Sequence, residues 1–394
     1  MRPLASALLV LGAAFAPATL YHAQVLWSEH LYLLLQMLLL WQLERDPPRA
    51  RNVLVAGLLV GLLLLTRTAG VAAAVAFTLW LLGRRPQRWG VALALAWLPL
   101  AERLTHRASA YGGELQGLFA NGAGGALARF AEHGAGLWQG WRDSVSMADP
   151  PGLAGPAVLL LLAALGWGLR LRRWRLDALL VPVYLAMLLN WGFSQHAPRF
   201  LYPLFPIAVY YAWLALSTAA EAVPTLPRRL VQGGVALVLA AALALPAVAQ
   251  VAQRMRIPLA PELAAYRNTQ MWLAMRPPEA APYMAHSLES TIGDLRRVRE
   301  LTPAGACVYA DSPGMVMVYA HRVPYQSPFT AVEQMVAKPE WPCRYVYVDP
   351  YAVDGLRDAA RRDRVGVRVL HASRFTPPDG PQEDGGMLLE LPVR

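Results

Sequence analysis

The sequence has few charged residues for its length. Asp, Glu, Lys and Arg together make up 16% of the 394 residues, well below the roughly 25% of an ordinary soluble domain. Hydrophobic residues, in contrast, make up 56%. This composition excludes a typical soluble globular protein and indicates a membrane protein.

Lysine is almost absent, because Lys338 is the single one in the chain, so nearly all of the positive charge comes from arginine. In a soluble chain, the formal net charge of +10 would suggest nucleic-acid binding. Here the arginines lie in short clusters between apolar runs, as membrane topology requires. We therefore expect no nucleic-acid partner.

Nine apolar runs are candidate membrane spans, although several are shorter than the ~20 residues of a full crossing. They are Leu4–Leu20, Ala23–Leu43, Val53–Thr66, Thr68–Leu82, Val91–Leu104, Gly155–Leu169, Ala178–Phe193, Phe200–Leu216 and Val231–Val251. Basic clusters occupy every second connection, beginning at Arg2, Arg45, Arg84, Arg170 and Arg228. The positive-inside rule places these connections in the cytoplasm. Residues 1–252 are thus predicted to form an α-helical polytopic membrane domain of about nine spans, with the loop Thr105–Pro151 and the C-terminal segment outside.

Arg67 interrupts a long apolar run from Val53 to Leu82. As one helix this run would be ~45 Å long, too long for one comfortable crossing. Both flanking basic clusters are predicted to be cytoplasmic, so the chain crosses twice and Arg67 lies at an outer turn. Two interpretations remain open: an ordinary interfacial charge, or an anion clamp in which the planar guanidinium binds a lipid phosphate.

Glu29 lies in the first turns of the apolar helix predicted over Ala23–Leu43, where an unpaired carboxylate is costly. It is either an interfacial acid or structural ion pair, or a pocket residue that faces a water-filled cavity. His22, Glu29 and His30 are also candidate metal ligands. Their spacing is not that of a metal site, so we assign no metal and leave the cofactor open.

A second group of polar residues precedes the span that begins at Phe200. In "SQHAPRFLYP", His196 and Arg199 come just before the span and Tyr202 lies at its start. A cationic pair at the mouth of a span either faces an anionic group or anchors the helix.

The pattern changes at about Gln253, and residues 253–394 are predicted to form a small extracytoplasmic α/β domain. A helix is expected over Ser290–Leu301 with Ser287 as its N-cap. "ACVYAD" and "CRYVYVDP" are predicted strands, and "GLRDAARRDRVGVRVL" is predicted to be a helix followed by a strand. Cys307 and Cys343 lie near the starts of the first two strands; in an oxidising compartment they can pair, but spacing does not establish that they are adjacent.

Four segments in this order resemble a known family. They are "SEHLYLLLQMLLLWQLER", "AGLLVGLLLLTRTAG", "PRFLYPLFPIAVYYAWLAL" and "TPAGACVYADSPGMVMVYAHRVPYQSP". Together they resemble the bacterial GT-C superfamily of polytopic glycosyltransferases, which includes protein O-mannosyltransferases and the aminoarabinose transferase of lipid A. The resemblance implies a multi-pass protein of the bacterial inner (plasma) membrane. It also implies transfer of a sugar from a polyprenyl-phosphate-linked donor to a glycan, lipid or protein acceptor outside the cytoplasm.

By the same resemblance, Glu29, Arg67 and Arg199 match acidic and basic positions of the family. In that chemistry a carboxylate base activates the acceptor and cations stabilise the leaving phosphate. Glu29 is then the candidate catalytic residue, while Arg67, Arg199, His30, His196 and Tyr202 are candidate substrate-binding residues.

One feature of the family has no counterpart in this sequence. The family pattern begins with an earlier span and an outer loop that carries an Asp, the presumed base. Four explanations remain open: the acid lies on a further segment, it comes from a partner, Glu29 takes its place as the base, or the chain does not catalyse. In the last case it is a polytopic protein that binds or transports a lipid-linked glycan.

Overall fold

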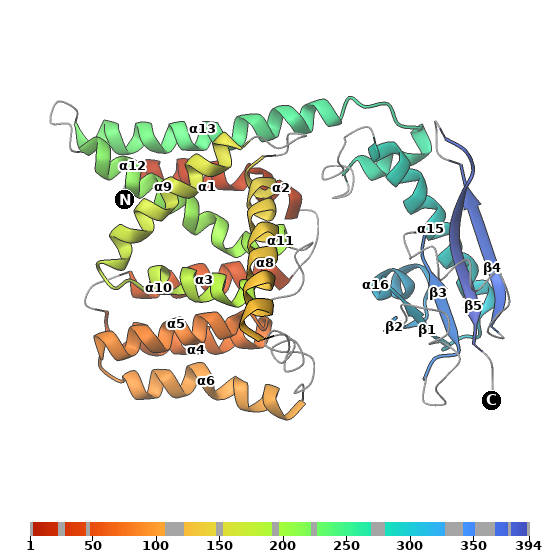
Figure 1. The fold of residues 1–394 in the computed structure, drawn as a ribbon, viewed down its shortest axis with the longest axis horizontal. Helices are drawn as coiled ribbons and strands as arrows, with labels where there is room; N and C mark the ends of the chain where they lie inside the picture. Colours follow the sequence, from red (N-terminus) through yellow and green to blue (C-terminus); the bar gives the residue numbers. More distant parts are fainter. Residues whose placement is uncertain are drawn as a thin grey trace. The chain divides into compact units, whose positions relative to one another are not determined.

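The computed structural model describes residues 3–22, 28–44, 48–106, 122–146, 153–190, 197–221, 227–268, 280–327, 342–350, 367–376 and 380–391. The chain divides into two compact units, Met1–Gln253 and Arg254–Arg394. The first unit is helical, and the second combines helices with a sheet (Figure 1).

The first unit is built from apolar helices. They are α1 (Pro3–Ala14), α2 (Pro17–His22), α3 (Ser28–Leu43), α4 (Ala50–Thr66), α5 (Gly70–Arg84), α6 (Trp89–His106), α8 (Gly122–Val145), α9 (Ala154–Leu171), α10 (Leu176–Leu189), α11 (Ala197–Leu201), the 3-10 turn η2 (Tyr202–Leu204), α12 (Phe205–Glu221) and α13 (Arg228–Arg254). Among the described residues, three helices are long and apolar enough to cross a membrane: α9, the continuous segment Ala197–Glu221, and α13. Shorter apolar helices accompany them. The unit therefore has the character of a helical membrane protein.

Three predicted elements can be compared directly with the helices. The break at Arg67 is confirmed, because α4 ends at Thr66 and α5 begins at Gly70. The run Leu4–Leu20, predicted as one span, is not one continuous helix, since α1 ends at Ala14 and a new helix begins at Pro17, a residue that suits the first helical position. The predicted loop Thr105–Pro151 contains the 24-residue helix α8. The helix was not predicted because its many Gly and Ala residues lower its mean hydropathy, although one side of it is apolar and includes Trp138 and the buried Trp141.

Close helix packing in this unit depends on glycine. A Cβ atom on Gly57 of α4 would collide with the Ala92 carbonyl of α6, and a Cβ on Gly166 of α9 would collide with the Tyr211 carbonyl of α12. Small residues let helix backbones approach in this way in membrane proteins, where no hydrophobic force favours helix–helix over helix–lipid contact.

An ion network joins helix ends at one end of the unit. The Arg170 guanidinium at the end of α9 donates to both carboxylate oxygens of Asp177 at 2.8 and 2.9 Å, and to both of Glu44 at 2.9 and 3.0 Å. Arg175 donates to the Glu44 carbonyl at 3.0 Å, and Arg84 donates to the Arg173 carbonyl. The connections after α3, α5 and α9 therefore meet here. We call this end, defined by Arg84, Arg170, Arg173 and Arg175, the basic end.

The second unit contains a five-stranded sheet and a long helix. The described strands are β1 (Cys307–Ala310), β2 (Val323–Gln326), β3 (Tyr345–Val348), β4 (Arg368–Phe375) and β5 (Glu383–Glu390), in the order β2-β1-β3-β5-β4. The pairs β1–β2 and β1–β3 are parallel, and the pairs β3–β5 and β4–β5 are antiparallel. Shorter helical elements are η3 (Pro261–Asn268), α16 (Pro313–Met315) and η5 (Val316–Ala320).

The predicted strands in "ACVYAD", "CRYVYVDP" and "VRVL" are confirmed as β1, β3 and part of β4. The helix expected before β4 lies outside the described residues. Ser287 as an N-cap is wrong: α15 runs from Ala281 to Leu301, and Ser287 is buried within it. The helix begins earlier because Pro282 sits in its first turn, where a missing N–H costs nothing.

The helix α15 is attached to the sheet through a buried acid. Asp294 Oδ2 accepts hydrogen bonds from Ser373 Oγ at 2.7 Å and from the Gly386 N–H at 2.9 Å, and Oδ1 lies 2.9 Å from His371 Nε2. Burial, and then the Asp294 charge, raise the pKa of Tyr347, so that its hydroxyl stays protonated and can donate to the same carboxylate. The buried charge is thus satisfied from three strands, which indicates a structural role.

Cys307 and Cys343 form a disulfide, with their Cα atoms 5.0 Å apart. It links the first residue of β1 to the segment that enters β3, its neighbour in the sheet. The bond closes a loop of 36 residues, and a loop of this length is worth about 3–4 kcal/mol of chain entropy.

We expect both cysteines of the protein from native membranes to resist a maleimide reagent until a reductant is added. The Cys307→Ser/Cys343→Ser variant should lose stability in the second unit, measured as a lower unfolding midpoint and faster proteolysis. Complete labelling of both thiols without reductant would contradict the pairing.

Candidate functional site: an ion cluster at one end of the helical unit

Glu29 is the centre of a charged cluster built from three separate segments. It is the second residue of α3 and is fully buried. Arg67 ends α4 in an extended conformation at the turn into α5, and Arg199 lies in the short helix α11. The sequence places these three residues far apart, and the fold brings their side chains together.

Both guanidinium groups contact the same carboxylate. Glu29 Oε1 pairs with Arg67 Nη1 and with Arg199 Nε, and Glu29 Oε2 accepts a longer bond from Arg199 Nη2 at 3.4 Å. Ser28 Oγ lies 3.4 Å from Oε2 as well. We call Glu29, Arg67 and Arg199 the Glu29 cluster. One acid shared by two cations leaves it with a formal charge of +1.

Access to the cluster differs among its members. The Glu29 side chain is 1% exposed, that of Arg67 is 14% exposed and that of Arg199 is 33% exposed. A ligand that approaches from solvent therefore meets the arginines, with the carboxylate beneath them.

Aromatic rings border the cluster. The Arg67 guanidinium carbon lies 5.5 Å from the centre of the Phe200 ring, within the range of a cation–π contact. His30 and the buried Tyr202 meet edge to face, with ring centres 5.6 Å apart. The structure thus brings five of the six candidate residues into one region, whereas His196 lies outside the described residues.

Three buried side chains that were not predicted from the sequence donate hydrogen bonds to backbone carbonyls near the cluster. Tyr32 donates to the Ala69 carbonyl at 3.2 Å, Gln36 to the Pro203 carbonyl at 2.9 Å, and Tyr184 to the Phe200 carbonyl at 3.0 Å. Tyr32 and Gln36 follow Glu29 at helical spacings of three and seven residues, which places all three on one face of α3. The spacing of Tyr32 and Gln36 from Glu29 could have identified them from the sequence as neighbours of this residue. No comparable sequence pattern points to Tyr184.

Among the side chains that the structure describes, no group of three or more His, Cys, Asp or Glu residues is placed to hold a metal ion. The His22 side chain, one of the three candidate ligands, is not among those described.

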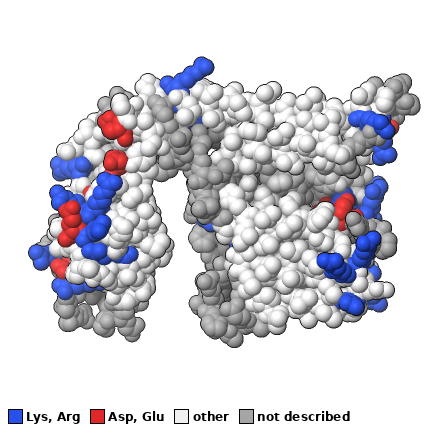
Figure 2. Space-filling view, turned by 180° about the vertical axis from the view of Figure 1, so that it is seen from behind, with Lys and Arg blue, Asp and Glu red and all other residues white. Residues whose placement is uncertain are grey.

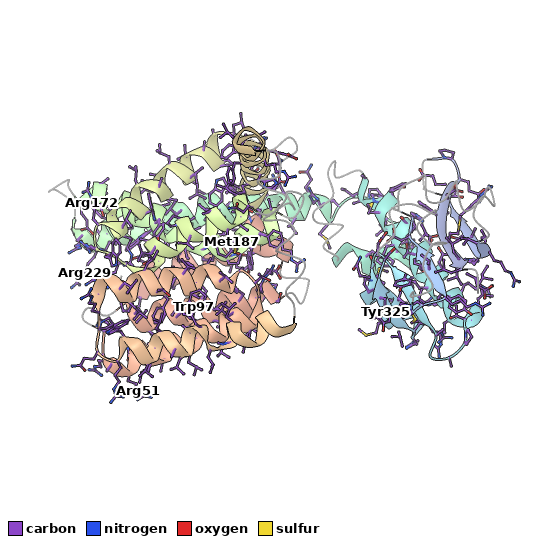
Figure 3. The ribbon with its side chains drawn as sticks, turned by 60° about the horizontal axis from the view of Figure 1, so that its bottom comes forward. Arg51, Trp97, Arg172, Met187, Arg229 and Tyr325 are labelled. Atoms are coloured by element: carbon purple, nitrogen blue, oxygen red, sulfur yellow. A yellow bond between two sulfur atoms is a disulfide. The ribbon has the colours of Figure 1, made fainter. Side chains whose placement is uncertain are left out.

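The Glu29 cluster and the basic end lie at opposite ends of α3. Glu29 begins this helix and Glu44, which binds Arg170, directly follows it, so that roughly 22 Å separates the two acids at 1.5 Å per residue. Arg51, Arg172 and Arg229 all lie at the basic end of the helical unit (Figure 3). On the face shown in Figure 2, uncharged side chains form a broad area and the charged side chains of this unit gather at that end.

An apolar cavity of about 420 Å³ lies between α8, α9, α10 and α12. Trp138, Trp141 and Trp167 contribute to its walls, as do Leu201 and Leu204, which follow Arg199 in the chain. Its lining suits a hydrocarbon chain rather than a polar molecule.

Comparison of the chain with protein-family models, with curated proteins and with solved structures finds no match.

Proposed function

We propose that the chain transfers a sugar from a polyprenyl-phosphate-linked donor to an acceptor outside the cytoplasm, as its resemblance to the GT-C superfamily implies. The observation that carries the proposal is the convergence of Arg67 and Arg199, from separate helical segments, on one buried carboxylate. The pair would hold the phosphate of the donor and stabilise its charge as the sugar leaves.

The proposal requires the Glu29 cluster to lie at the extracytoplasmic side of about nine spans in the bacterial inner membrane. Two observations support this orientation. The arginine-rich connections meet at the basic end, opposite the cluster, and the positive-inside rule assigns such an end to the cytoplasm. The disulfide Cys307–Cys343 suits an oxidising compartment for the second unit.

The chemistry of the cluster favours a phosphate over a carboxylate or a neutral sugar. Each guanidinium carries five N–H donors in a planar fork, and a single carboxylate cannot accept hydrogen bonds from all of them. Glu29 thus aligns the two forks and leaves a net positive charge that a phosphate would neutralise. The cavity beside Leu201 and Leu204 offers an apolar path for the hydrocarbon chain of the same lipid.

The role of Glu29 separates this proposal from its alternative. A buried carboxylate held by two cations is a weak proton acceptor, so Glu29 is better suited to organising the arginines than to acting as the base. This favours, as a second candidate, a protein that binds or transports a lipid-linked glycan without turnover. Glycosyl transfer would then need an acid that is not part of the Glu29 cluster.

The test compares binding of farnesyl phosphate in detergent with transfer from a polyprenyl-phosphate sugar. Arg67→Ala and Arg199→Ala should each weaken binding at least ~10-fold, the loss of one charge-assisted contact, and should abolish transfer. Arg51→Ala removes an exposed arginine from the basic end and should change neither. If Arg67→Ala and Arg199→Ala both bound farnesyl phosphate as tightly as the wild-type protein, the proposal that these arginines form a phosphate site would be wrong. Binding without transfer by the wild-type protein would favour the non-catalytic candidate.

A further inference from the structure

We propose that Tyr32 and Tyr184 are positioning residues that fix the spacing between Arg67 and Arg199. Each tyrosine hydroxyl donates a hydrogen bond to a backbone carbonyl within two residues of one of the arginines. Both guanidinium groups are thereby kept at a distance at which they can bind one anionic group. The identity of that anion rests on the proposed function, whereas the spacing itself does not.

The turn that carries Arg67 is held by Tyr32. The Tyr32 side chain is fully buried, and its hydroxyl donates to the carbonyl of Ala69, two residues after Arg67. The turn is tight, because a Cβ atom on Gly70 would collide with the backbone of Leu63. Since Tyr32 and Glu29 lie on the same face of α3, this hydrogen bond fixes the Arg67 turn relative to the helix that supplies the carboxylate.

The segment that carries Arg199 is held by Tyr184. This residue lies in α10, is 1% exposed, and donates to the carbonyl of Phe200, the residue after Arg199. The Phe200 ring in turn lies under the Arg67 guanidinium. One backbone carbonyl therefore anchors both the Arg199 segment and the aromatic surface against which Arg67 packs.

The two tyrosines contact each other. Their ring centres are 6.3 Å apart with a tilt of 50° between the rings. A single buried pair thus spans from the Arg67 turn to the Arg199 segment, and a shift of either ring would move one arginine relative to the other. Gln36 adds a third contact by donating to the Pro203 carbonyl, which holds the turn after Arg199.

Removing these hydroxyls would have different effects if they only stabilise the fold and if they also position the arginines. Loss of a buried hydrogen bond lowers stability in either case. Only a positioning role also changes the distance between the two arginine segments and the affinity for an anion. The conservative change Tyr→Phe isolates the hydroxyl, because it keeps the ring and its packing.

The first experiment measures the spacing without a ligand. Cysteines are introduced next to the arginines, as Thr68→Cys and Pro198→Cys, and joined by bis-methanethiosulfonate reagents of increasing length. The native cysteines do not interfere, since they form a disulfide. We expect one reagent length to dominate in the parent. In Tyr32→Phe/Tyr184→Phe the yield should spread over several lengths, and an unchanged length profile would overturn the positioning role.

The second experiment measures farnesyl phosphate affinity, with farnesol as the control that lacks the phosphate. Tyr32→Phe and Tyr184→Phe should each weaken binding roughly five- to ten-fold, the effect of one net hydrogen bond. Tyr210→Phe is the control: its partly buried ring lies against Arg170 at the basic end, it serves neither the Ala69 nor the Phe200 carbonyl, and the affinity of this variant should not change. Unchanged affinity in both variants, with binding intact in the wild type, would overturn the positioning role. Failure of the wild-type protein to bind farnesyl phosphate would instead overturn the proposed function, and the cross-linking profile would still decide the spacing.

Discussion

Replacing Arg170 with alanine is expected to destabilise the helical unit by about 3–5 kcal/mol, the cost of breaking a buried ion pair from one side. The main cause is Asp177, whose side chain is 5% exposed and would keep a charge without its partner. Glu44 contributes less because its side chain is 53% exposed. At roughly 2–4 °C per kcal/mol, the unfolding midpoint in detergent should fall by about 10 °C.

Two further variants make this expectation specific. Arg172→Ala removes a neighbouring arginine that is exposed, and should leave the midpoint within about 1 °C. The combined change Arg170→Met/Asp177→Asn/Glu44→Gln removes all the charges together and should recover most of the loss, because no unpaired charge remains. An Arg170→Ala protein as stable as the wild type would show that the network does not hold the basic end together.

Gly166→Ala is expected to have the second large effect. The added methyl group would collide with the backbone carbonyl of Tyr211, so α9 and α12 would have to separate, at a cost of about 1–3 kcal/mol. Gly168→Ala on the same helix is the matched control. A Cβ there meets nothing within 4 Å, and alanine is the better helix former by about 1 kcal/mol.

The two glycine variants should therefore change stability in opposite directions. The measurement is the unfolding midpoint of each in the same detergent, with the helix content checked by circular dichroism. Equal midpoints for Gly166→Ala and Gly168→Ala would contradict close backbone contact between α9 and α12.

The sequence was sufficient to locate the charged residues of the candidate site. The break at Arg67 followed from the positions of the basic clusters and from the length of the apolar run, and the structure has the two helices on either side of it. Glu29 stood out because a carboxylate in an apolar helix is costly. These signals are local in the sequence, so they identify the charged residues but not the residues that each one contacts in the fold.

The contacts between these residues depend on tertiary structure that local pattern does not contain. Glu29 and Arg199 are 170 positions apart, and Glu44 and Arg170 are 126 apart. The helix α8 was missed because Gly and Ala lower its hydropathy, although its apolar residues recur on one side. Ser287 was misassigned as an N-cap because the helix begins upstream, at Ala281, and already includes this serine. A serine caps a helix only when it directly precedes the first helical residue.

The central claim is that the Glu29 cluster binds the phosphate of a lipid carrier. The most direct test is mass spectrometry of the lipids that copurify with the wild-type protein and with Arg67→Ala/Arg199→Ala, both extracted from the same native membranes. The account predicts a polyprenyl phosphate, or its sugar-linked form, enriched in the wild-type sample and lost from the variant. Equal recovery of that lipid in both samples, or its absence from the wild-type protein, would contradict the claim.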